Sequence, residues 1–200
     1  MGRSENSRNR VFAMEQEFVR TKAYDESKLT DPSLVIYYPL KMHGTKHIIS
    51  NGDQTETLYD AIKAGKTIEE ALSQRTFEPD APNFTPRITG LVDLGSKFAY
   101  VLSILKSIHG NEDYCSRNYY YYEKAIPGFG HCIHTYACDG SPLPSFSSDP
   151  YLLAVEESID NNLNKFWSML NEENRISLLV KTIDVKTGVC EIRIKNKHGE

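Results

Sequence analysis

Strand-forming runs occur in neighbouring pairs along this chain of 200 residues, and helical patterns lie between the pairs. The run from Phe98 to Lys106 is almost entirely apolar, which favours a strand buried on both faces. Ser177 to Ile183 and Val189 to Ile194, joined by the turn at 186–188, predict a hairpin. This arrangement predicts an α+β fold with antiparallel sheets, because a parallel sheet requires strict alternation of strand and helix.

Four further runs predict strands. The β-branched and aromatic run from Leu34 to Tyr38 has high strand propensity, and a turn at 43–44 predicts a hairpin leading into 47–49. The segment 131–136 is another strand candidate. Four consecutive tyrosines occupy 119–122, where strand alternation would send alternate rings to opposite faces. We expect one pair in the core and the other facing a cleft.

The sequence predicts three helices. Apolar residues at helical spacing predict a helix that ends at Gly65. Thr67 and Glu70 have the spacing of a capping box, which predicts a second helix near 68–76. A broad apolar stripe over 159–170 predicts an amphipathic helix that packs on a sheet.

Composition excludes several classes of function. The formal net charge of -4 argues against a protein that neutralises a phosphate backbone, so nucleic acid is not an expected partner. No run approaches the roughly 20 apolar residues of a membrane helix, and the first residues have no secretory h-region, which predicts no membrane partner and a cytoplasmic location. The four cysteines lack CxxC spacing, and free thiols are expected. The sequence leaves homo-oligomerisation open.

The common cofactor and catalytic signatures are absent from the sequence, so polar loop clusters are the candidates for chemistry. Three arginines within eight residues, accompanied by hydroxyl and amide side chains, could bind an anion through their guanidinium forks; a solvated terminus is the alternative. This cluster comprises Arg3, Ser4, Ser7, Arg8, Asn9 and Arg10. The segment 51–55 lies at a strand-to-helix junction, where amides could bind an anion or an oxyanion; a simple helix cap is the alternative.

Two more clusters lie further along the chain. Arg87 stands between a proline and a turn that ends in glycine, and this position would preorganise its side chain for binding. The alternative is that Arg87 belongs to a surface turn. Arg87 follows the segment 77–86, whose three prolines exclude a regular element and indicate an ordered loop or a lid. His131 and His134 would point to opposite faces of a strand, so shared metal ligation is not expected. We interpret His134 as a single proton donor or general acid/base, and the tyrosines as packing residues.

Taken together, these clusters resemble the archaeal-type IMP cyclohydrolase family, in particular its bacterial branch. The resemblance covers most of the chain through several distinct motifs in the same order. They are Arg-Ser-x-x-Ser-Arg-Asn-Arg at 3–10, the segment from Pro32 to Tyr38, Ser-Asn-Gly-Asp-Gln-Thr at 50–55, Asn-Phe-Thr-Pro-Arg-Ile-Thr-Gly at 83–90, Gly-His-Cys-Ile-His-Thr-Tyr at 130–136 and Asp-Gly-Ser-Pro-Leu-Pro-Ser-Phe at 139–146.

The resemblance implies a four-layer αββα sandwich like that of N-terminal-nucleophile hydrolases, without a self-processed nucleophile. It also implies the closure of 5-formamidoimidazole-4-carboxamide ribotide to inosine monophosphate with loss of water, the last step of purine synthesis, using no redox cofactor and no obligatory metal. The alternatives are a non-catalytic purine-nucleotide binding module and an amide hydrolase on the same scaffold. For the hydrolase, no residue stands at an obvious N-terminal nucleophile position.

The resemblance also suggests roles for individual residues. Arg8, Arg10 and Arg87 would hold the phosphate or the formyl oxygen, Asn51 and Asp53 would orient the carboxamide, and Tyr37 would shuttle a proton. The predicted catalytic residues are Tyr37, Asn51, Asp53 and His134. The predicted substrate-binding residues are Arg3, Ser4, Arg8, Asn9, Arg10, Gly52, Thr55, Asn83, Thr85 and Arg87.

The chain is expected to form one domain over 1–200, in which an upstream hairpin of family members is missing. Loss of central strands exposes sheet edges and removes part of a substrate pocket. We therefore predict poor stability or low activity for the 200-residue form; a cooperative melt together with full turnover would contradict this.

Overall fold

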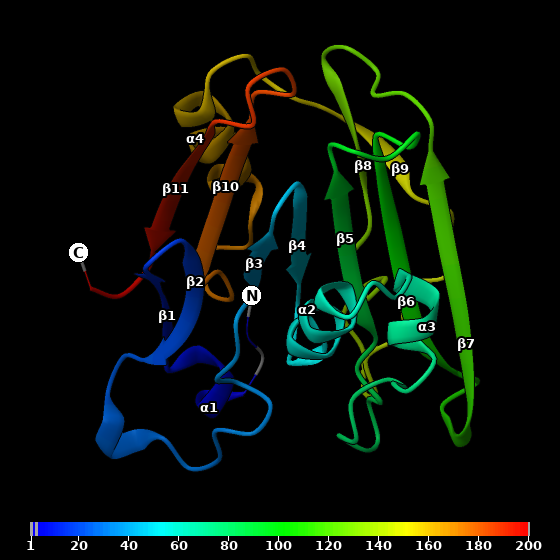
Figure 1. Cartoon of the computed structure of the whole chain (residues 1–200). Coiled ribbons are helices and arrows are strands. Elements are labelled where there is room, and N and C mark those ends of the chain that lie inside the picture. Colours follow the sequence, from blue (N-terminus) through cyan, green and yellow to red (C-terminus); the bar gives the residue numbers. More distant parts are fainter. Residues whose placement is uncertain (1, 3, 200) are drawn as a thin grey trace. The chain divides into compact units, whose positions relative to one another are not determined.

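The computed structural model describes residues 2 and 4–199, which fall into two compact units. Unit 1 comprises the described residues of 1–38 together with those of 154–200, and unit 2 comprises 39–153. Both units combine antiparallel strands with a small number of helices, so the α+β prediction is confirmed (Figure 1).

Unit 2 is built on an antiparallel sheet in which consecutive strands are neighbours. Its strands are β3 (Leu40–His43), β4 (Lys46–Ser50), β5 (Arg87–Asp93), β6 (Tyr100–Ile108) and β7 (Asn111–Tyr122). The predicted hairpin at 43–44 is present, and Gly44 adopts a φ of 58°, the left-handed conformation that a glycine accepts without strain. The apolar run that begins at Phe98 becomes β6, in which Val101, Ile104 and Leu105 are buried.

Helices α2 (Gln54–Lys63) and α3 (Ile68–Leu72) are inserted between β4 and β5. The predicted stop at Gly65, whose φ is 73°, and the capping box of Thr67 with Glu70 are both present. α3 ends at Leu72, several residues earlier than the sequence pattern suggests. Apolar side chains from both helices and from the two strands β4 and β6 form one core, to which Ile48, Leu58, Ile62, Ile68, Ala71, Leu72, Val101 and Leu105 belong.

The register of the sheet decides which polar residues lie beneath α2. Ser50 is paired with Thr89, and Thr89 with Ser103, so these side chains share the face of Ile48 and Val101. Arg87, the first residue of β5, is on the same face and is 5% exposed. The start of α2 and the start of β5 therefore enclose a polar region at one end of the apolar core.

The last part of unit 2 contains the strand pair β8 (Phe129–Cys132) and β9 (Tyr151–Ala154), of which Ala154 is counted with unit 1. The predicted strand over 131–136 is only partly correct, because β8 stops at Cys132. His134 consequently lies in a loop, and the alternation argument applied to its orientation does not hold.

Unit 1 contains two hairpins, β1 (Arg10–Glu15) with β2 (Phe18–Ala23) and β10 (Ser177–Ile183) with β11 (Cys190–Asn196). The Asn196 side chain joins them, because its amide accepts from the Phe12 N–H at 2.9 Å and donates to the Phe12 carbonyl at 3.0 Å. α4 (Ile159–Met169) packs on β10 and β11, as the apolar stripe predicted. Unit 1 also holds the short α1 (Glu5–Arg8) and η1 (Glu26–Lys28).

The predicted strand from Leu34 to Tyr38 is wrong. The chain turns after Pro32, whose carbonyl accepts from the N–H groups of Val35 and Ile36 at 3.1 and 2.9 Å. Only Tyr37 is held in a strand-like manner: its carbonyl accepts from the Thr21 N–H at 2.9 Å, and its N–H donates to the Thr21 hydroxyl at 2.7 Å. The N–H groups of Val35 and Ile36 are thus satisfied within the turn, whereas a strand would pair them with a neighbouring strand.

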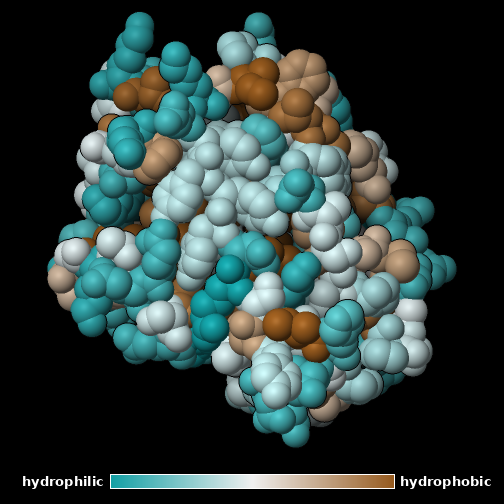
Figure 2. Space-filling model, turned by 90° about the vertical axis from the view of Figure 1, so that its right-hand side faces the viewer, coloured by the Kyte–Doolittle hydropathy of each residue, from teal (hydrophilic) through white to brown (hydrophobic). Residues whose placement is uncertain are grey.

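The four tyrosines alternate along β7 as expected, but the pair expected in the core is not buried there, because Tyr121 is 40% exposed and lines a cavity. Tyr119 packs against the core of unit 2, whereas Tyr122 lies on the opposite face and stacks on His131 with ring centroids 3.8 Å apart. Figure 2, which views the molecule from the side of β7, shows a broad pale band of side chains of intermediate hydropathy, the class that includes tyrosine. Within 2 and 4–199, no helix is long and apolar enough to span a membrane.

Candidate active site

Asn51 ties the end of β4 to the beginning of β5. Its Nδ2 donates to the Pro86 carbonyl at 2.8 Å, and its Oδ1 accepts from the Ile88 N–H at 2.9 Å. The same Oδ1 accepts from the Gln54 amide at 2.9 Å. Since a primary amide carries two N–H hydrogens, one Nδ2 hydrogen of Asn51 has no partner among the residues that the structure describes.

Arg87 is the centre of a buried charge cluster. Its NH1 donates to Asp53 Oδ1 at 2.5 Å and to Gln54 Oε1 at 2.9 Å, and lies 3.8 Å from Glu78 Oε1. Arg75 forms an ion pair with the other Asp53 oxygen. The two arginines and the two carboxylates balance in charge. A guanidinium can be buried in this way because its charge and its hydrogen bonds are both compensated.

Gly52 allows the cluster to close around it. A Cβ at this position would lie 2.7 Å from Gln54 Oε1, 2.8 Å from Arg87 NH1 and 3.0 Å from Glu78 Oε1. Glycine is therefore required by the close approach of polar side chains. Thr55, also predicted as a site residue, is fully buried and lies 2.5 Å from the Ser50 hydroxyl, which makes it part of the support of the junction.

Asp53 is the exposed member of the cluster, with 42% of its side chain accessible. Partial burial alone would raise the pKa of Asp53, but Arg75 and Arg87 outweigh it and hold the pKa below the usual range of an aspartate. Asp53 is thus a carboxylate at neutral pH. It is suited to accept hydrogen bonds from a substrate, and poorly suited to act as a base that must gain a proton near pH 7.

The lowered pKa of Asp53 predicts an acid-dependent contribution to stability. The folded state favours the carboxylate, so the contribution is present above the unfolded pKa and is lost as pH falls through the folded one. The difference in free energy of unfolding between wild type and Asp53→Asn is therefore expected to be constant above about pH 5 and to shrink below about pH 4. Urea unfolding of both proteins from pH 7 to pH 3 measures it. A difference that is unchanged at pH 3 would contradict the prediction.

A second set of hydrogen bonds joins Thr85 to Tyr136 and His134. The Thr85 hydroxyl donates to the Asp80 carboxylate, which also accepts from the Thr85 N–H at 2.7 Å. Because that hydroxyl has one hydrogen, the Tyr136 hydroxyl at 2.5 Å must donate to it. The Tyr136 carbonyl lies 2.5 Å from His134 Nδ1, so Nδ1 donates and a neutral His134 has its lone pair on Nε2.

His134 lines a cavity of about 250 Å³ together with Phe146 and Tyr151. The centroid of its ring is 4.4 Å from that of Phe146 and 5.7 Å from that of Tyr151. Asn83 supports the same loop, because its Oδ1 accepts from the Leu143 N–H at 3.0 Å. Thus the segments 83–90 and 130–146, which lie far apart in the sequence, are joined by hydrogen bonds within unit 2.

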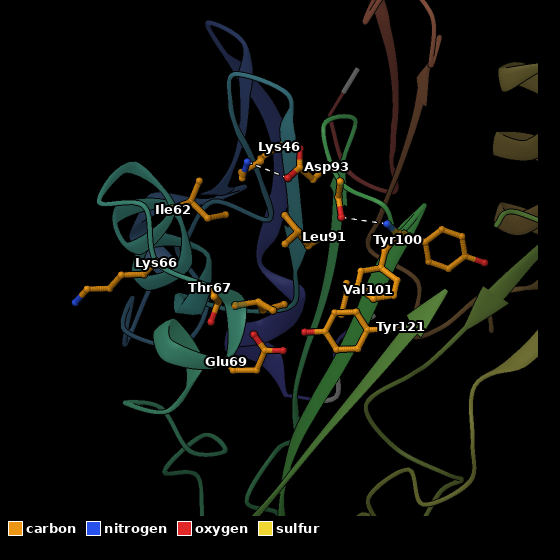
Figure 3. A pocket seen from close by; sticks show the side chains of 13 residues that line it. Lys46, Ile62, Lys66, Thr67, Glu69, Leu91, Asp93, Tyr100, Val101 and Tyr121 are labelled. Carbon is orange, nitrogen blue, oxygen red and sulfur yellow. Dashed lines mark hydrogen bonds and ion pairs between the residues drawn. The ribbon is translucent and has the colours of Figure 1, made fainter. Parts of the chain in front are cut away.

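A cavity of about 290 Å³ lies elsewhere in unit 2, between the two helices and the sheet (Figure 3). Its floor includes Ile62, Leu91 and Val101, and the Lys46–Asp93 ion pair at 2.9 Å borders it. None of the predicted site residues that the structure describes lines it. The polar residues that the sequence singled out do not gather there, so we do not assign the catalytic chemistry to this cavity.

The predicted residues of unit 1 are held mainly by internal contacts. Ser4 caps α1, and the Asn9 amide pairs with the Asp25 backbone at 2.8 Å in both directions. Arg8 donates to Asn174 Oδ1 at 2.7 Å, and the Arg10 guanidinium lies 5.9 Å from the centroid of the Tyr37 ring. Tyr37 is 7% exposed. Arg3 lies outside the described residues. A pocket shared by these residues and those of unit 2 remains a prediction.

Sequence reasoning missed the residues that support the site. Gln54 is fully buried and Glu78 is 7% exposed, yet both were treated as part of a cap or a loop. Tyr136 was assigned to a strand, and Arg75 was not noticed. The available signals were the position of Gln54 within the 50–55 motif and that of Tyr136 within the 130–136 motif, because the partners of Arg75 and Glu78 come from distant segments.

Fold and site together define an antiparallel α+β protein whose polar site is formed where a strand passes into a helix. The chain belongs to the IMP cyclohydrolase-like protein family, whose family model matches residues 1–188. A search of curated proteins found no match. Membership of the family indicates a protein of the cyclohydrolase class that acts on a small-molecule nucleotide.

Proposed function

We propose that this protein closes the ring of 5-formamidoimidazole-4-carboxamide ribotide to give inosine monophosphate. The carboxamide nitrogen attacks the formyl carbon, forming the new C–N bond. One hydrogen of the attacking nitrogen passes to the formyl oxygen, and the resulting hydroxyl leaves as water with the hydrogen of the formamido nitrogen, so that the C=N double bond of the new ring forms. Family membership supports the reaction, and the Asn51–Asp53 pair supports a place for it in unit 2.

The observation that carries the proposal is the pairing of an amide donor with an ionised acceptor. Asn51 has an uncommitted Nδ2 hydrogen, and Asp53 is an exposed carboxylate whose pKa is lowered. A substrate carboxamide presents the complementary groups, a carbonyl that accepts and an N–H that donates. Two such contacts would orient the nitrogen toward the formyl group, and orientation accounts for much of the rate of an intramolecular closure.

We assign the proton transfers and the binding of the phosphate to the other residues that the sequence predicted. We propose that His134 exchanges protons through Nε2, since Nδ1 is engaged by the Tyr136 carbonyl. Arg8, Arg10 and Tyr37 are proposed to serve the phosphate and a proton transfer. Arg87 is proposed to act through Asp53 and not by holding phosphate, because carboxylates already compensate its buried charge. The four-layer αββα arrangement and one domain over 1–200 stay predictions.

The test is to incubate the 200-residue chain, and a version extended upstream, with the formamido ribotide and to follow the ultraviolet change on ring closure. We expect turnover that is abolished or strongly reduced in Asp53→Asn and in Asn51→Ala. Binding of inosine monophosphate by calorimetry without turnover in either version would identify a non-catalytic nucleotide-binding module and refute the proposed activity.

A further inference from the structure

We propose that Gln54 is a positioning residue that sets the orientation of both Asn51 and Asp53. The inference rests on the proposed function, in which Gln54 itself does not contact the substrate. Gln54 is the first residue of α2 and is fully buried. Burial of a primary amide is costly unless its hydrogen bonds are satisfied, so its contacts show what it is placed to do.

The donor end of Gln54 orients Asn51. Its Nε2 donates to Asn51 Oδ1 at 2.9 Å and to the Ile88 carbonyl at 3.1 Å. Together with the Ile88 N–H, which also donates to Asn51 Oδ1 at 2.9 Å, this contact fixes which way the Asn51 amide faces, with Nδ2 toward the Pro86 carbonyl. If the Asn51 amide were rotated, its oxygen would face the substrate carbonyl. Both groups are acceptors, so no hydrogen bond could form between them.

The acceptor end of Gln54 orients Asp53 through Arg87. Gln54 Oε1 and Asp53 Oδ1 accept from the same NH1 of Arg87, at 2.9 and 2.5 Å. Gln54 thereby fixes the position of the Arg87 guanidinium, and the hydrogen bond from Arg87 in turn orients the Asp53 carboxylate. One amide therefore links the donor and the acceptor that the proposed function requires, and its two ends are not interchangeable.

The informative substitution is Gln54→Glu. At neutral pH the introduced carboxylate can still accept from Arg87, but its second oxygen faces Asn51 Oδ1 and the Ile88 carbonyl, which are also acceptors. The groups around position 54 are Asp53 at the start of α2, Arg75 and Glu78 of the following loops, and Arg87 of β5. Protonation of the introduced carboxylate restores a donor toward Asn51, so lowering the pH should repair the defect.

We expect Gln54→Glu to lower kcat about 10- to 100-fold at pH 8 with a smaller change in KM, as for a displaced catalytic geometry. The loss should diminish as pH falls toward 5.5 relative to wild type. Gln54→Met, which removes both polar functions, should lose kcat without recovery at low pH. Gln16→Glu, at an exposed turn of unit 1, is the control for an added charge and should behave like wild type.

A second measurement separates this inference from the proposed function. The side-chain amide signals of Asn51 in a ¹H–¹⁵N spectrum should shift in Gln54→Glu and return toward wild-type positions as the pH is lowered, whether or not the protein turns over the ribotide. Wild type without turnover, but with this titrating shift in the variant, would refute the activity and support the positioning role. Unchanged Asn51 signals, or equal kcat losses in Gln54→Glu and Gln54→Met at every pH, would overturn it.

Discussion

Replacing Arg87 by alanine is expected to lower the free energy of unfolding of unit 2 by about 3–5 kcal/mol, the usual cost of removing one member of a buried ion pair. Arg87 is 5% exposed and lies against Asp53 and Glu78. Without it, the carboxylate of Glu78, itself 7% exposed, would lose the guanidinium that lies 3.8 Å from its Oε1, and Asp53 would keep only Arg75 of its two arginines. Urea unfolding monitored by circular dichroism measures the change.

The same substitution should weaken nucleotide binding and reduce turnover about 100-fold or more, because Asp53 loses the guanidinium that orients it and displacements of about 1 Å in catalytic geometry have effects of that size. If Arg87→Ala does not fold, Arg87→Lys provides the test. It keeps the charge but loses the fork that contacts Asp53 and Gln54. Arg193→Ala is the matched control, because Arg193 is paired with Asp160 at 3.1 Å at an exposed site, where such pairs contribute about 1 kcal/mol or less. Equal losses in Arg87→Ala and Arg193→Ala would contradict a central role for Arg87.

Gly52→Ala is expected to disturb the site with only one added methyl group. The methyl would lie 2.8 Å from Arg87 NH1 and 2.7 Å from Gln54 Oε1, so the charge cluster must shift to accept it. Overpacking of this kind costs about 1–3 kcal/mol. We expect kcat to fall about 100-fold, because displacements of about 1 Å in catalytic geometry have effects of that size.

Gly95→Ala separates this effect from a general loss of glycine. Neither position requires a left-handed backbone, but a Cβ at Gly95 would meet its nearest neighbours at 3.4 and 3.6 Å, an ordinary contact distance. Gly95→Ala should therefore retain wild-type turnover and stability. A Gly52→Ala protein with wild-type kcat would show that the cluster tolerates displacement, and it would remove the cluster from the proposed mechanism.

Most elements of the fold could be predicted because local physics specifies them. The Thr67–Glu70 capping box, the stop at Gly65 and the apolar stripe of α4 depend on neighbours within a few residues. The strand assigned to 34–38 was wrong because propensity cannot detect a turn whose backbone groups are satisfied by Pro32 and by Thr21 on another strand.

The candidate site was predictable to a smaller extent. Asn51, Asp53 and Arg87 could be selected from their residue types, and the structure brings them together through Gln54. The sequence could not predict which groups these three side chains contact. That Arg87 holds the phosphate or the formyl oxygen stays a prediction, whereas its contacts in the structure are carboxylates and an amide of its own chain, because β5 places it beneath the start of α2.

The sequence alone determined the antiparallel α+β class, the family and the residue types available for chemistry, since periodicity, capping and motifs are local properties of the chain. Only the tertiary structure decided which carboxylate neutralises which arginine, which end of each amide is free, and which nitrogen of His134 can exchange a proton. Those choices depend on hydrogen bonds and ion pairs between residues that the chain separates by up to tens of positions, and burial makes each of them costly to leave unsatisfied.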